Sequence, residues 1–447
     1  MIPAEGIYAA RATWGNQELK GMLYIGRRPT LDDGRELTIE LNIFDFNRDI
    51  YGDELSVSLV GHVRGDQEYK GLDELTKQLA QDETDSRKIL AEEDSGVADT
   101  DNFQDTAIVI LNYNGRHYLE TYLPPLQDSL LPNCRIVIAD NKSTDDSVEW
   151  LKAHYPDLIL LELPENYGFA GGYNEALKQV AAEVYVLLNS DVQVTHDWLA
   201  PCLNMLSEDP QVGAIQPKVL AQADPGKFEY AGGAGGWMDA LGYPFCRGRV
   251  FAVTEPDVGQ YNEVQEIFWA TGAALFVRAE LFHQIGGFEA EYFAHAEEID
   301  LCWRLKKAGF KVMAQPASTV YHVGGGTLSY NTPRKTYLNF RNTLTTSFKN
   351  ERGLKLLWWF PLRMVLDGVA GGLFLTQGNF LHIKAIVQAH WHFFPRMGFW
   401  WKRRKLRKQQ IKAISIGPDR SHVGRLQESI IIHYYLLGHQ TFKKILG

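Results

Sequence analysis

Five short segments carry polar residues whose types and order suit the binding of a nucleotide. In chain order they are VILNYN at 109–114, IADNKSTDDS at 138–147, NYGFAGGYN at 166–174, LLNSDV at 187–192 and AEEIDLCWR at 296–304. Asp140 can accept a hydrogen bond from the N–H group of a pyrimidine base. The glycines of the third segment allow the backbone to approach a ligand closely. The fifth segment contains two adjacent acids, Glu297 and Glu298.

Apolar runs precede several of these segments and predict the elements that position them. Residues 107–111 (AIVIL), 136–139 (IVIA) and 184–188 (VYVLL) are short and rich in β-branched residues, as is typical of buried parallel strands. A further strand is expected at 158–163, and a helix at 145–153. Because strands and helices alternate, we predict an α/β fold with a doubly wound, mostly parallel sheet.

Polar residues follow directly after the predicted strands. Asn112, Asp140 and Asp191 each lie just past an apolar run, and ligands of such sheets bind beyond the carboxyl ends of the strands. Asn114 would face the same nucleotide, and Asn174 is expected to begin a helix whose N-terminus suits a phosphate. The alternative is that these residues only form turns and caps, where Asn, Asp and Gly are common.

The second half of this region is expected to complete the site. Residues 268–278 (FWATGAALFVR) predict a strand with a small-residue turn, followed by a short helix and a turn at 286–288. Residues 297–304 are expected to open a helix. The glycine tracts at 231–236 and 324–326 predict mobile loops that close over a ligand.

The ordered motifs resemble the inverting family 2 glycosyltransferases with a GT-A fold, and among them the rhamnosyltransferase-like group, over about residues 105–345. The resemblance implies that a nucleotide-diphosphate sugar donates a sugar to a cell-surface polysaccharide or glycolipid. It implies a set of nucleotide-sugar contacts at the strand ends and the glycine-rich turn. These are Asn112, Asn114, Asp140, Asn141, Ser143, Asn166, Gly168, Gly171, Gly172, Asn174 and Asn189.

The resemblance also implies a divalent metal, Mg²⁺ or Mn²⁺. Asp191 matches the last acid of the family's Asp-x-Asp motif and would bind the metal on the diphosphate. Asn189 replaces the first acid of that motif. His322, in VYHVGGGT at 320–327, is a candidate further ligand, and the alternative is a plain loop histidine.

The catalytic base is expected at the start of the helix at 297–304. In the family the second acid of an acidic pair removes the proton of the acceptor hydroxyl, which here assigns Glu298 and leaves Glu297 as a rival. Asp300 is expected to cap the helix or to orient Arg304. The alternative for the whole cluster is a solvated helix start favoured by the helix dipole.

The first 90 residues resemble another family. GMLYIGRRPT at 21–30 and TIELNIFDFNRDIYGDEL at 38–55 resemble the C-terminal part of bacterial riboflavin kinase, a small β-barrel. The resemblance assigns a catalytic base to the position of Glu40 and places the segment around Arg28–Thr30 in the barrel lining. Asn42 stands where histidine is usual.

Strands at 37–46 and 55–61, a turn at Asn47–Gly52 and an amphipathic helix at 71–89 fit this module. The family's Pro-Thr-Ala-Asn motif for Mg-ATP does not occur in the sequence. We therefore expect residues 1–90 to be a remnant or a truncated start, forming a partial barrel without riboflavin kinase activity.

Composition predicts the remaining organisation. Residues 91–105 are acidic and almost free of apolar side chains, which indicates a linker between the module at 1–90 and a transferase domain at 106–345. The four cysteines, at 134, 202, 246 and 302, have no paired or metal-binding spacing, as is typical of a reducing compartment. No signal peptide is recognised.

The region 346–447 is expected to bind a membrane surface. From residue 351 it has 16 Lys and Arg against 4 Asp and Glu, whereas the whole chain carries −10. An apolar stretch at 356–375 is interrupted by Arg363 and Asp367, and KRRKLRK follows at 402–408. Aromatic and cationic residues together indicate helices in the interface of an anionic membrane. Nucleic-acid binding is not expected, because the neighbours are bulky and apolar, and a buried amphipathic subdomain is the remaining alternative.

The prediction is thus a cytoplasmic glycosyltransferase, peripherally attached to the inner face of the plasma membrane. Two other functions are weighed against it. One is riboflavin kinase activity of the N-terminal module, alone or in a bifunctional fusion. The other is a binding module without catalysis.

Overall fold

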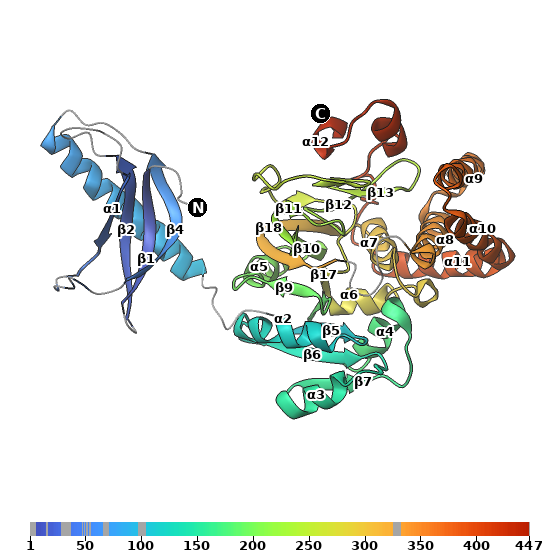
Figure 1. Ribbon diagram of the computed structural model, residues 1–447, viewed down its shortest axis with the longest axis horizontal. Coiled ribbons are helices and arrows are strands. Elements are labelled where there is room, and N and C mark those ends of the chain that lie inside the picture. Colours follow the sequence, from blue (N-terminus) through green and yellow to red (C-terminus); the bar gives the residue numbers. More distant parts are fainter. Residues whose placement is uncertain are drawn as a thin grey trace. The chain divides into compact units, whose positions relative to one another are not determined.

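The computed structural model describes residues 6–14, 17–27, 37–46, 48, 50, 52, 55–65, 71–96, 104–324 and 332–446. The chain divides into two compact units, residues 1–102 and 103–447, each with its own sheet (Figure 1). The sequence predictions for Arg28–Thr30, for half of the turn at 47–52 and for Gly325–Gly326 lie outside the described residues.

The first unit is an antiparallel sheet with one long helix. Its elements are β1 (Gly6–Trp14), β2 (Gln17–Arg27), β3 (Leu37–Ile43), β4 (Ser56–Gly65) and α1 (Leu72–Gly96), and the strand order is β3-β2-β1-β4. Leu90 and Ile89 of α1 pack against Ile7 and Ala9 of β1. The expected antiparallel β region is present. The helix is longer than predicted and includes residues 91–96, which the acidic composition had assigned to the linker.

A ten-stranded mixed sheet forms the centre of the second unit (Figure 1). Its strands are β5 (Thr106–Asn112), β6 (Cys134–Asp140), β7 (Ile159–Glu162), β8 (Val184–Leu188), β9 (Val192–Val194), β10 (Val212–Ala221), β11 (Asp224–Phe228), β16 (Gln265–Glu266), β17 (Ala274–Arg278) and β18 (Lys311–His322). The main path runs β16-β18-β10-β17-β8-β5-β6-β7. β7, β6, β5 and β8 are parallel neighbours, and β17 lies antiparallel between β8 and β10. The predicted α/β class is confirmed.

Helices cover this sheet, and the same unit contains a separate small sheet. The helices are α2 (Arg116–Asp128), α3 (Ser147–His154), α4 (Gly168–Leu177), α5 (Ala200–Glu208), α6 (Ala279–Gln284), η2 (Ala290–Tyr292) and α7 (Glu297–Lys307). The small sheet contains β12 (Gly236–Met238), β13 (Pro244–Cys246), β14 (Arg249–Val250) and β15 (Val253–Thr254). Val109 and Leu187 of the central strands are fully buried, as expected for strands covered on both faces.

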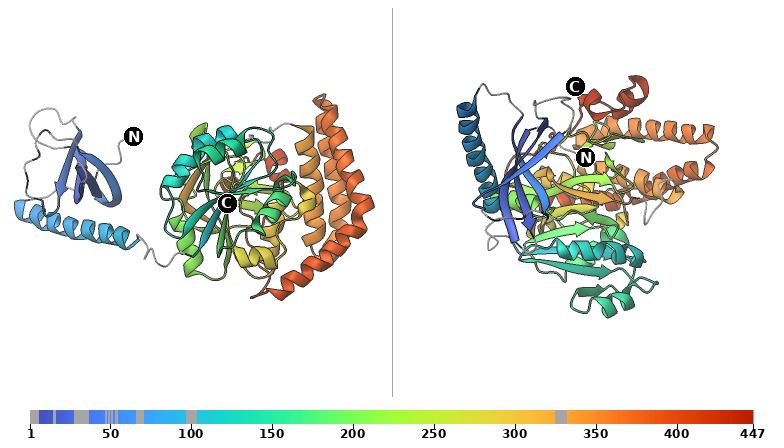
Figure 2. Two further views of the ribbon diagram at one scale, coloured as in Figure 1. Left: turned by 90° about the horizontal axis from the view of Figure 1, so that it is seen from below. Right: turned by 60° about the vertical axis from the view of Figure 1, so that its left-hand side comes forward.

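The C-terminal helices pack into the same unit. They are α8 (Pro333–Asn350), α9 (Gly353–Thr376), α10 (Phe380–Phe393), η3 (Phe394–Arg396), α11 (Met397–Ala413), η4 (Ile432–Leu436) and α12 (Phe442–Leu446). Helix α8 lies beside α10 and α11 along one flank of the unit (Figure 2). One apolar core includes Val109 of β5, Trp303 of α7, Trp359 of α9 and Trp400 of α11. The expected division after residue 345 is wrong, because α8 crosses it and its side chains join this core.

Part of the cationic run that was predicted to bind a membrane is buried in the protein. Within KRRKLRK, Arg404 and Arg407 are buried, at 5% and 4% exposure, whereas the three lysines are exposed. Arg404 donates to the main-chain carbonyls of Phe348 and Glu351, so it serves the fold. None of the helices within the described residues has the length and apolar character needed to cross a membrane.

The glycine tract at 231–236 is a packed turn, which corrects the expectation of a mobile loop. Gly232 to Gly236 are buried, and a Cβ on Gly235 would come within 2.6 Å of Ile267. Gly235 donates its N–H to the carbonyl of Gly232, and Ala234 donates to that of Arg247. The glycines are needed because bulky side chains from distant segments leave no room.

Candidate functional site

A polar network joins the carboxyl ends of β5 and β6. Asn112 lies opposite Asp140 in the parallel pair, and its Nδ2 donates to Asp140 Oδ1 at 3.0 Å and to Ser143 Oγ at 3.1 Å. The backbone N–H of Ser143 donates to Asp140 Oδ2 at 2.9 Å. Asn114, at φ 53°, accepts the N–H of Thr144 at 2.7 Å. Four residues predicted from sequence are therefore brought together.

Asn141 extends this network to the turn before α4. Its Nδ2 donates to Asn166 Oδ1 at 3.1 Å and to the carbonyl of Gly168 at 3.0 Å. Asn166 Oδ1 also accepts the N–H of Gly168 at 2.9 Å. We call Asn112, Asn114, Asp140, Asn141, Ser143 and Asn166 the strand-end network. Within the described residues, one buried acceptor of this network has no hydrogen-bond partner, Asn112 Oδ1.

Helix α4 begins at Gly168, so the prediction that Asn174 starts a helix is wrong. The first N–H groups of α4 are also taken, because Phe169 and Ala170 both donate to the carbonyl of Phe293, at 2.6 and 3.1 Å. The amide of Asn174 donates to the carbonyl of Phe288 at 3.0 Å and accepts its N–H at 2.9 Å. These contacts fix the turn at 286–288 and leave no free helix end for a phosphate.

Gly171 and Gly172 are buried within α4. A Cβ on Gly172 would lie 2.8 Å from Leu111 of β5, and one on Gly171 would lie 3.0 Å from Tyr167. Both glycines let the helix approach its neighbours closely. This packing explains them without a direct contact to a ligand.

Asp191 and His322 face each other beyond β8 and β18. His322 Nε2 lies 3.3 Å from Asp191 Oδ1, and His322 Nδ1 lies 3.4 Å from Glu229 Oε2 on the other side of the ring. All three side chains are at least nine-tenths buried. Because the two acids approach opposite ring nitrogens, they do not converge on one point. Accordingly, no set of three or more His, Cys, Asp or Glu able to hold a metal occurs in the described part of the chain.

Asp191 and His322 nevertheless fit the role of two ligands of a divalent ion. Burial alone lowers the pKa of His322, but the interactions with Asp191 and Glu229 outweigh it and raise that pKa to about 10. An ion at Nε2 would replace this proton, while Glu229 would keep the proton on Nδ1 and hold the ring. Asn189 is half-buried next to this pair. Carboxylate oxygen is the ligand that Mg²⁺ and Mn²⁺ prefer.

Helix α7 starts with the two predicted acids. Glu297 is 4% exposed and Glu298 is half-buried, and Oε2 of each is buried without a hydrogen-bond partner among the described residues. Burial raises the pKa of Glu298 to about 7. Burial, and then the neighbouring Glu298, raise the pKa of Glu297 well above its usual value. At neutral pH Glu298 is therefore the acid that can be ionised.

The turn before α7 holds an unusual backbone. Phe293, His295 and Ala296 have φ values of 67°, 72° and 69°, a left-handed conformation that costs a non-glycine residue about 1–3 kcal/mol. Burial, followed by the nearby Lys335, lowers the pKa of His295 to about 4, so the imidazole is neutral. We call residues 292–298 the α7 turn.

Asn342 of α8 holds the α7 turn in this conformation. Its Nδ2 lies within hydrogen-bond distance of the carbonyl oxygens of Tyr292 (3.1 Å), Ala294 (2.8 Å) and His295 (2.8 Å). Arg341 donates to the carbonyl of Tyr292 at 2.8 Å. Asn342 is fully buried. These contacts to carbonyl groups are what stabilises the strained turn.

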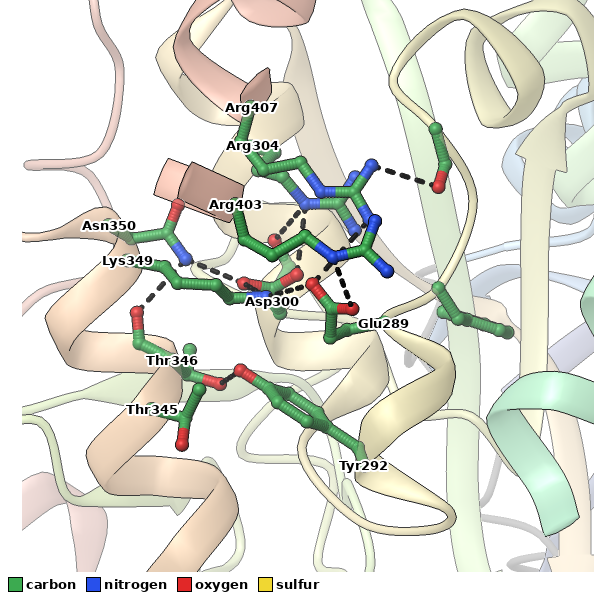
Figure 3. Close-up of polar contacts among 12 residues, drawn as sticks. Glu289, Tyr292, Asp300, Arg304, Thr345, Thr346, Lys349, Asn350, Arg403 and Arg407 are labelled. Carbon is green, nitrogen blue, oxygen red and sulfur yellow. Dashed lines mark hydrogen bonds and ion pairs between the residues drawn. The ribbon is translucent and has the colours of Figure 1, made fainter. Parts of the chain in front are cut away.

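A buried charged cluster fixes the rest of α7 (Figure 3). Asp300 accepts from Arg304 Nε at 3.0 Å and from Asn350 Nδ2 at 2.7 Å, and it lies 3.1 Å from Lys349 Nζ. Arg304 also donates to the carbonyls of Ile285 and Gly287. Lys349, followed by Arg304, holds the pKa of Asp300 well below its usual value despite burial. Asp300 thus orients Arg304, as one of the sequence expectations had it.

Helix α11 reaches the same cluster. Lys349 Nζ lies 2.9 Å from Glu289 Oε2, and Arg407 and Arg403 approach this carboxylate at 3.7 and 3.6 Å (Figure 3). Arg407 Nη1 also donates to the carbonyl of Gly286 at 3.0 Å. The C-terminal helices therefore contribute to the position of the acids at the start of α7.

Sequence reasoning missed Glu229, Asn342 and Lys349. Glu229 stands in KFEYAGG, which matches no motif used above. Asn342 and Lys349 lie on an amphipathic helix that had been divided between two regions. Their one signal was their position beside apolar residues of the same helix, Leu338, Leu344 and Phe348, which are buried with them.

Glu40 lies in the first unit. It is an exposed residue of β3, opposite Tyr24 of β2. Its environment therefore differs from that of the buried acids on α7.

Comparisons with known proteins agree with both resemblances. Residues 107–263 match the family model for glycosyl transferase family 2, and residues 1–90 match that for riboflavin kinase. An N-acetylglucosaminyl-diphospho-decaprenol L-rhamnosyltransferase of Mycobacterium tuberculosis is 26% identical over 276 residues, which cover 58% of this chain and 89% of that protein. An RNA-binding riboflavin kinase of Bacillus subtilis is 38% identical over 77 residues, 17% of this chain and 34% of that protein.

Among solved structures, a mannosyltransferase from Pyrobaculum calidifontis in complex with GDP-Man and Mn²⁺ aligns with a TM-score of 0.41 and 16% identity, over 71% of this chain and 85% of that one. The family matches and the curated relatives identify the chain as a glycosyltransferase with a family 2 domain at residues 107–263 and a riboflavin-kinase-like region at its N-terminal end.

Proposed function

We propose that the chain transfers a sugar, with inversion, from a metal-bound nucleotide-diphosphate sugar to a glycan carried on a lipid. One observation carries the proposal: Glu297 and Glu298, whose buried Oε2 atoms have no hydrogen-bond partner among the described residues, belong to the same compact unit as the Asp191–His322 pair and the strand-end network. The name of the mycobacterial relative, which describes a diphosphate-linked lipid acceptor, supports this acceptor class.

The strand-end network binds the nucleotide. Asp140 and Asn112 retain acceptor capacity for the N–H groups of a base, since each carboxylate oxygen has two lone pairs and Asn112 Oδ1 has no partner. Asp191 and His322 would hold Mg²⁺ or Mn²⁺, which neutralises the departing diphosphate. Glu229 keeps the imidazole of His322 in the required orientation.

Glu298 removes the proton from the acceptor hydroxyl. Its pKa of about 7 leaves a large ionised fraction at neutral pH and makes it a stronger base than an ordinary glutamate. The oxygen of the acceptor then forms a bond to the anomeric carbon as the bond to the diphosphate breaks. Glu297, whose pKa is raised by burial and then by Glu298, is not assigned this step.

A donor panel tests this function. The purified chain is incubated with UDP-, GDP- and dTDP-sugars, Mn²⁺ and a short-chain lipid diphosphate glycan, and nucleotide release is measured with and without the acceptor. We expect one donor to give acceptor-dependent release. Binding of nucleotides with no release from any donor would favour the alternative of a non-catalytic module.

The C-terminal helices are proposed to lie on an anionic membrane. Leu354, Leu357, Phe380, Leu381 and Trp391 expose between 65% and 84% of their surface, and the exposed lysines 402, 405 and 408 lie on the neighbouring α11. Each charge near an anionic surface contributes about 1 kcal/mol.

Liposome co-sedimentation tests this placement. Replacing the three exposed lysines by glutamine should release much of the chain from anionic liposomes, whereas Arg404 and Arg407 must be left intact because they serve the fold. The matched control is replacement of Lys152, Lys178 and Lys227, which are exposed lysines of the same unit. Unchanged co-sedimentation would contradict the electrostatic part of the proposal.

The riboflavin-kinase-like region is proposed to lack kinase activity in this chain. Its match to the family model keeps the alternative open, but the sequence contains no Pro-Thr-Ala-Asn motif to hold Mg-ATP. A catalytic base can activate the hydroxyl of riboflavin, but without a positioned ATP phosphate that hydroxyl has no group to attack. Formation of FMN from riboflavin and ATP, lost on Glu40→Gln, would contradict this proposal.

A further inference from the structure

Arg249 of the small sheet is a buried cation with few partners. It is 8% exposed, yet its contacts are long: Nη1 to the carbonyl of Phe251 at 3.4 Å and Nη2 to Cys246 Sγ at 4.0 Å. Its Nε has no hydrogen-bond partner in the part of the chain that the structure describes. A guanidinium has five N–H donors, and burying a charge without partners costs several kcal/mol.

Within the described ranges, Arg249 forms no ion pair with a carboxylate. Its guanidinium carbon lies 3.9 Å from the ring centroid of Tyr230, and Tyr230 is 40% exposed. The arginine therefore lies directly beneath a side chain that borders the solvent. Because the contacts of Nη1 and Nη2 are long and Nε is unpartnered among the described residues, the guanidinium keeps donor capacity for a ligand.

Arg249 is also close to the proposed metal pair. Tyr230, on which it stacks, follows Glu229, and Glu229 lies 3.4 Å from His322, which lies 3.3 Å from Asp191. Lys335, in the first turn of α8, interacts electrostatically with both Glu229 and Arg249, and burial, opposed by Glu229 and reinforced by Arg249, lowers its pKa. Two carboxylates thus flank His322, and two cations lie near one of them, Glu229.

The balance of charge around Asp191 and His322 favours the binding of an anion when a metal ion is present. Asp191 and Glu229 offset Arg249 and Lys335, so a divalent ion bound at Asp191 and a neutral His322 would leave two positive charges in excess. A diphosphate group supplies that negative charge, and its oxygens are acceptors that match the planar fork of an arginine.

We propose that Arg249 and Lys335 form an anion subsite beside Asp191 and His322 and that this subsite binds a diphosphate group. The proposal rests on the proposed function. The diphosphate has two possible sources, the nucleotide-sugar donor and a lipid-diphosphate acceptor, and the experiment separates them.

The test is calorimetry on the full chain with Mn²⁺ and three probes: inorganic pyrophosphate, UDP and geranyl diphosphate. Arg249→Gln and Lys335→Gln should each weaken pyrophosphate binding by about tenfold or more, because a charged hydrogen bond is lost. Weaker binding of UDP assigns the subsite to the donor. Weaker binding of geranyl diphosphate alone assigns it to the acceptor.

Arg247→Gln is the matched control. Arg247 lies on the same hairpin and is 6% exposed, but it stacks at 5.1 Å on Tyr261 and donates to the carbonyl of Ala234. The Arg247→Gln variant should bind all three probes as the unaltered chain does. Thermal unfolding shows which variants are folded, and if Arg249→Gln is not, Lys335→Gln decides alone.

Wild-type affinity for all probes in the folded variants would overturn the subsite, as would an unaltered chain that binds none of them. Failure of the proposed function gives a different pattern. The unaltered chain would then bind pyrophosphate, and lose it in the two variants, but would release nucleotide from none of the sugar donors.

Discussion

The strand-end network and the α7 turn, which we propose to be two halves of one site, have opposite physical character. The strand-end network is nearly complete without a ligand, since the side chains of Asn112, Asp140 and Ser143 bind one another. The α7 turn instead combines left-handed backbone at Phe293, His295 and Ala296 with two acids whose buried Oε2 atoms have no partner among the described residues. A network that satisfies itself is rigid before the donor arrives. Unpaired acids in a strained turn are poised for a reacting group.

The comparison is tested most strongly at Asp191, the proposed metal ligand. Asp191→Ala removes the proposed metal ligand, and we expect donor affinity and transfer to fall together, transfer by about two to three powers of ten. Calorimetry with Mn²⁺ and nucleotide release measure the two quantities. Asp197→Ala is the control, because Asp197 is a fully exposed acid nearby. A variant that keeps donor affinity would remove Asp191 from the donor half.

Asn342→Ala should damage only the α7 turn. The carbonyls of Ala294 and His295 lose the contact to Asn342, and that of Tyr292 keeps only Arg341. The turn can then relax and displace Glu298, which we expect to lower kcat by about ten- to a hundredfold. Donor affinity should not change. The control is Asn339→Ala, an exposed asparagine of the same helix. Equal losses of kcat in both variants would show that the contact to the turn is unimportant.

The pH dependence of transfer should report Glu298. Its folded pKa of about 7 lies above the ordinary value of 4.5 because burial favours the neutral acid, so the active carboxylate is lost as the pH falls below 7. We expect kcat/KM to fall about tenfold per pH unit on the acid side. A profile that stays flat down to about pH 5 would contradict the assignment of a buried base.

Asn166→Ala should give the smallest effect, confined to the strand-end half. It removes the bonds to Asn141 and Gly168, which contribute about 1 kcal/mol each. We therefore expect donor affinity to weaken several-fold at unchanged kcat. An altered kcat with unchanged donor affinity would reverse the roles of the two halves.

Local sequence patterns predicted the parts of the fold in which neighbours along the chain determine the structure. The apolar runs before Asn112, Asp140 and Asp191 predicted their strands, and the acids at 297–298 predicted the start of α7. These patterns depend on burial and on the helix dipole, which act over a few residues.

Contacts between distant segments account for the errors. The carbonyl of Phe293 occupies the start of α4, which no local pattern reveals. Ile267 and Trp269 pack closely against Gly235 and Gly236, so the segment predicted to be a mobile loop is a packed turn. The two buried arginines of KRRKLRK were assigned to lipid because their carbonyl partners lie 53 to 122 residues away in sequence.

The most direct test measures donor affinity and transfer in Glu298→Gln and Glu297→Gln. Calorimetry with Mn²⁺ gives the affinity for the donor, and nucleotide release in the presence of acceptor gives the rate. We predict that Glu298→Gln keeps donor affinity and loses about two to four powers of ten in kcat, while Glu297→Gln changes kcat much less. Normal transfer by Glu298→Gln, with loss in Glu297→Gln, would place the base one residue earlier. Normal transfer by both variants would contradict the catalytic role of the α7 turn.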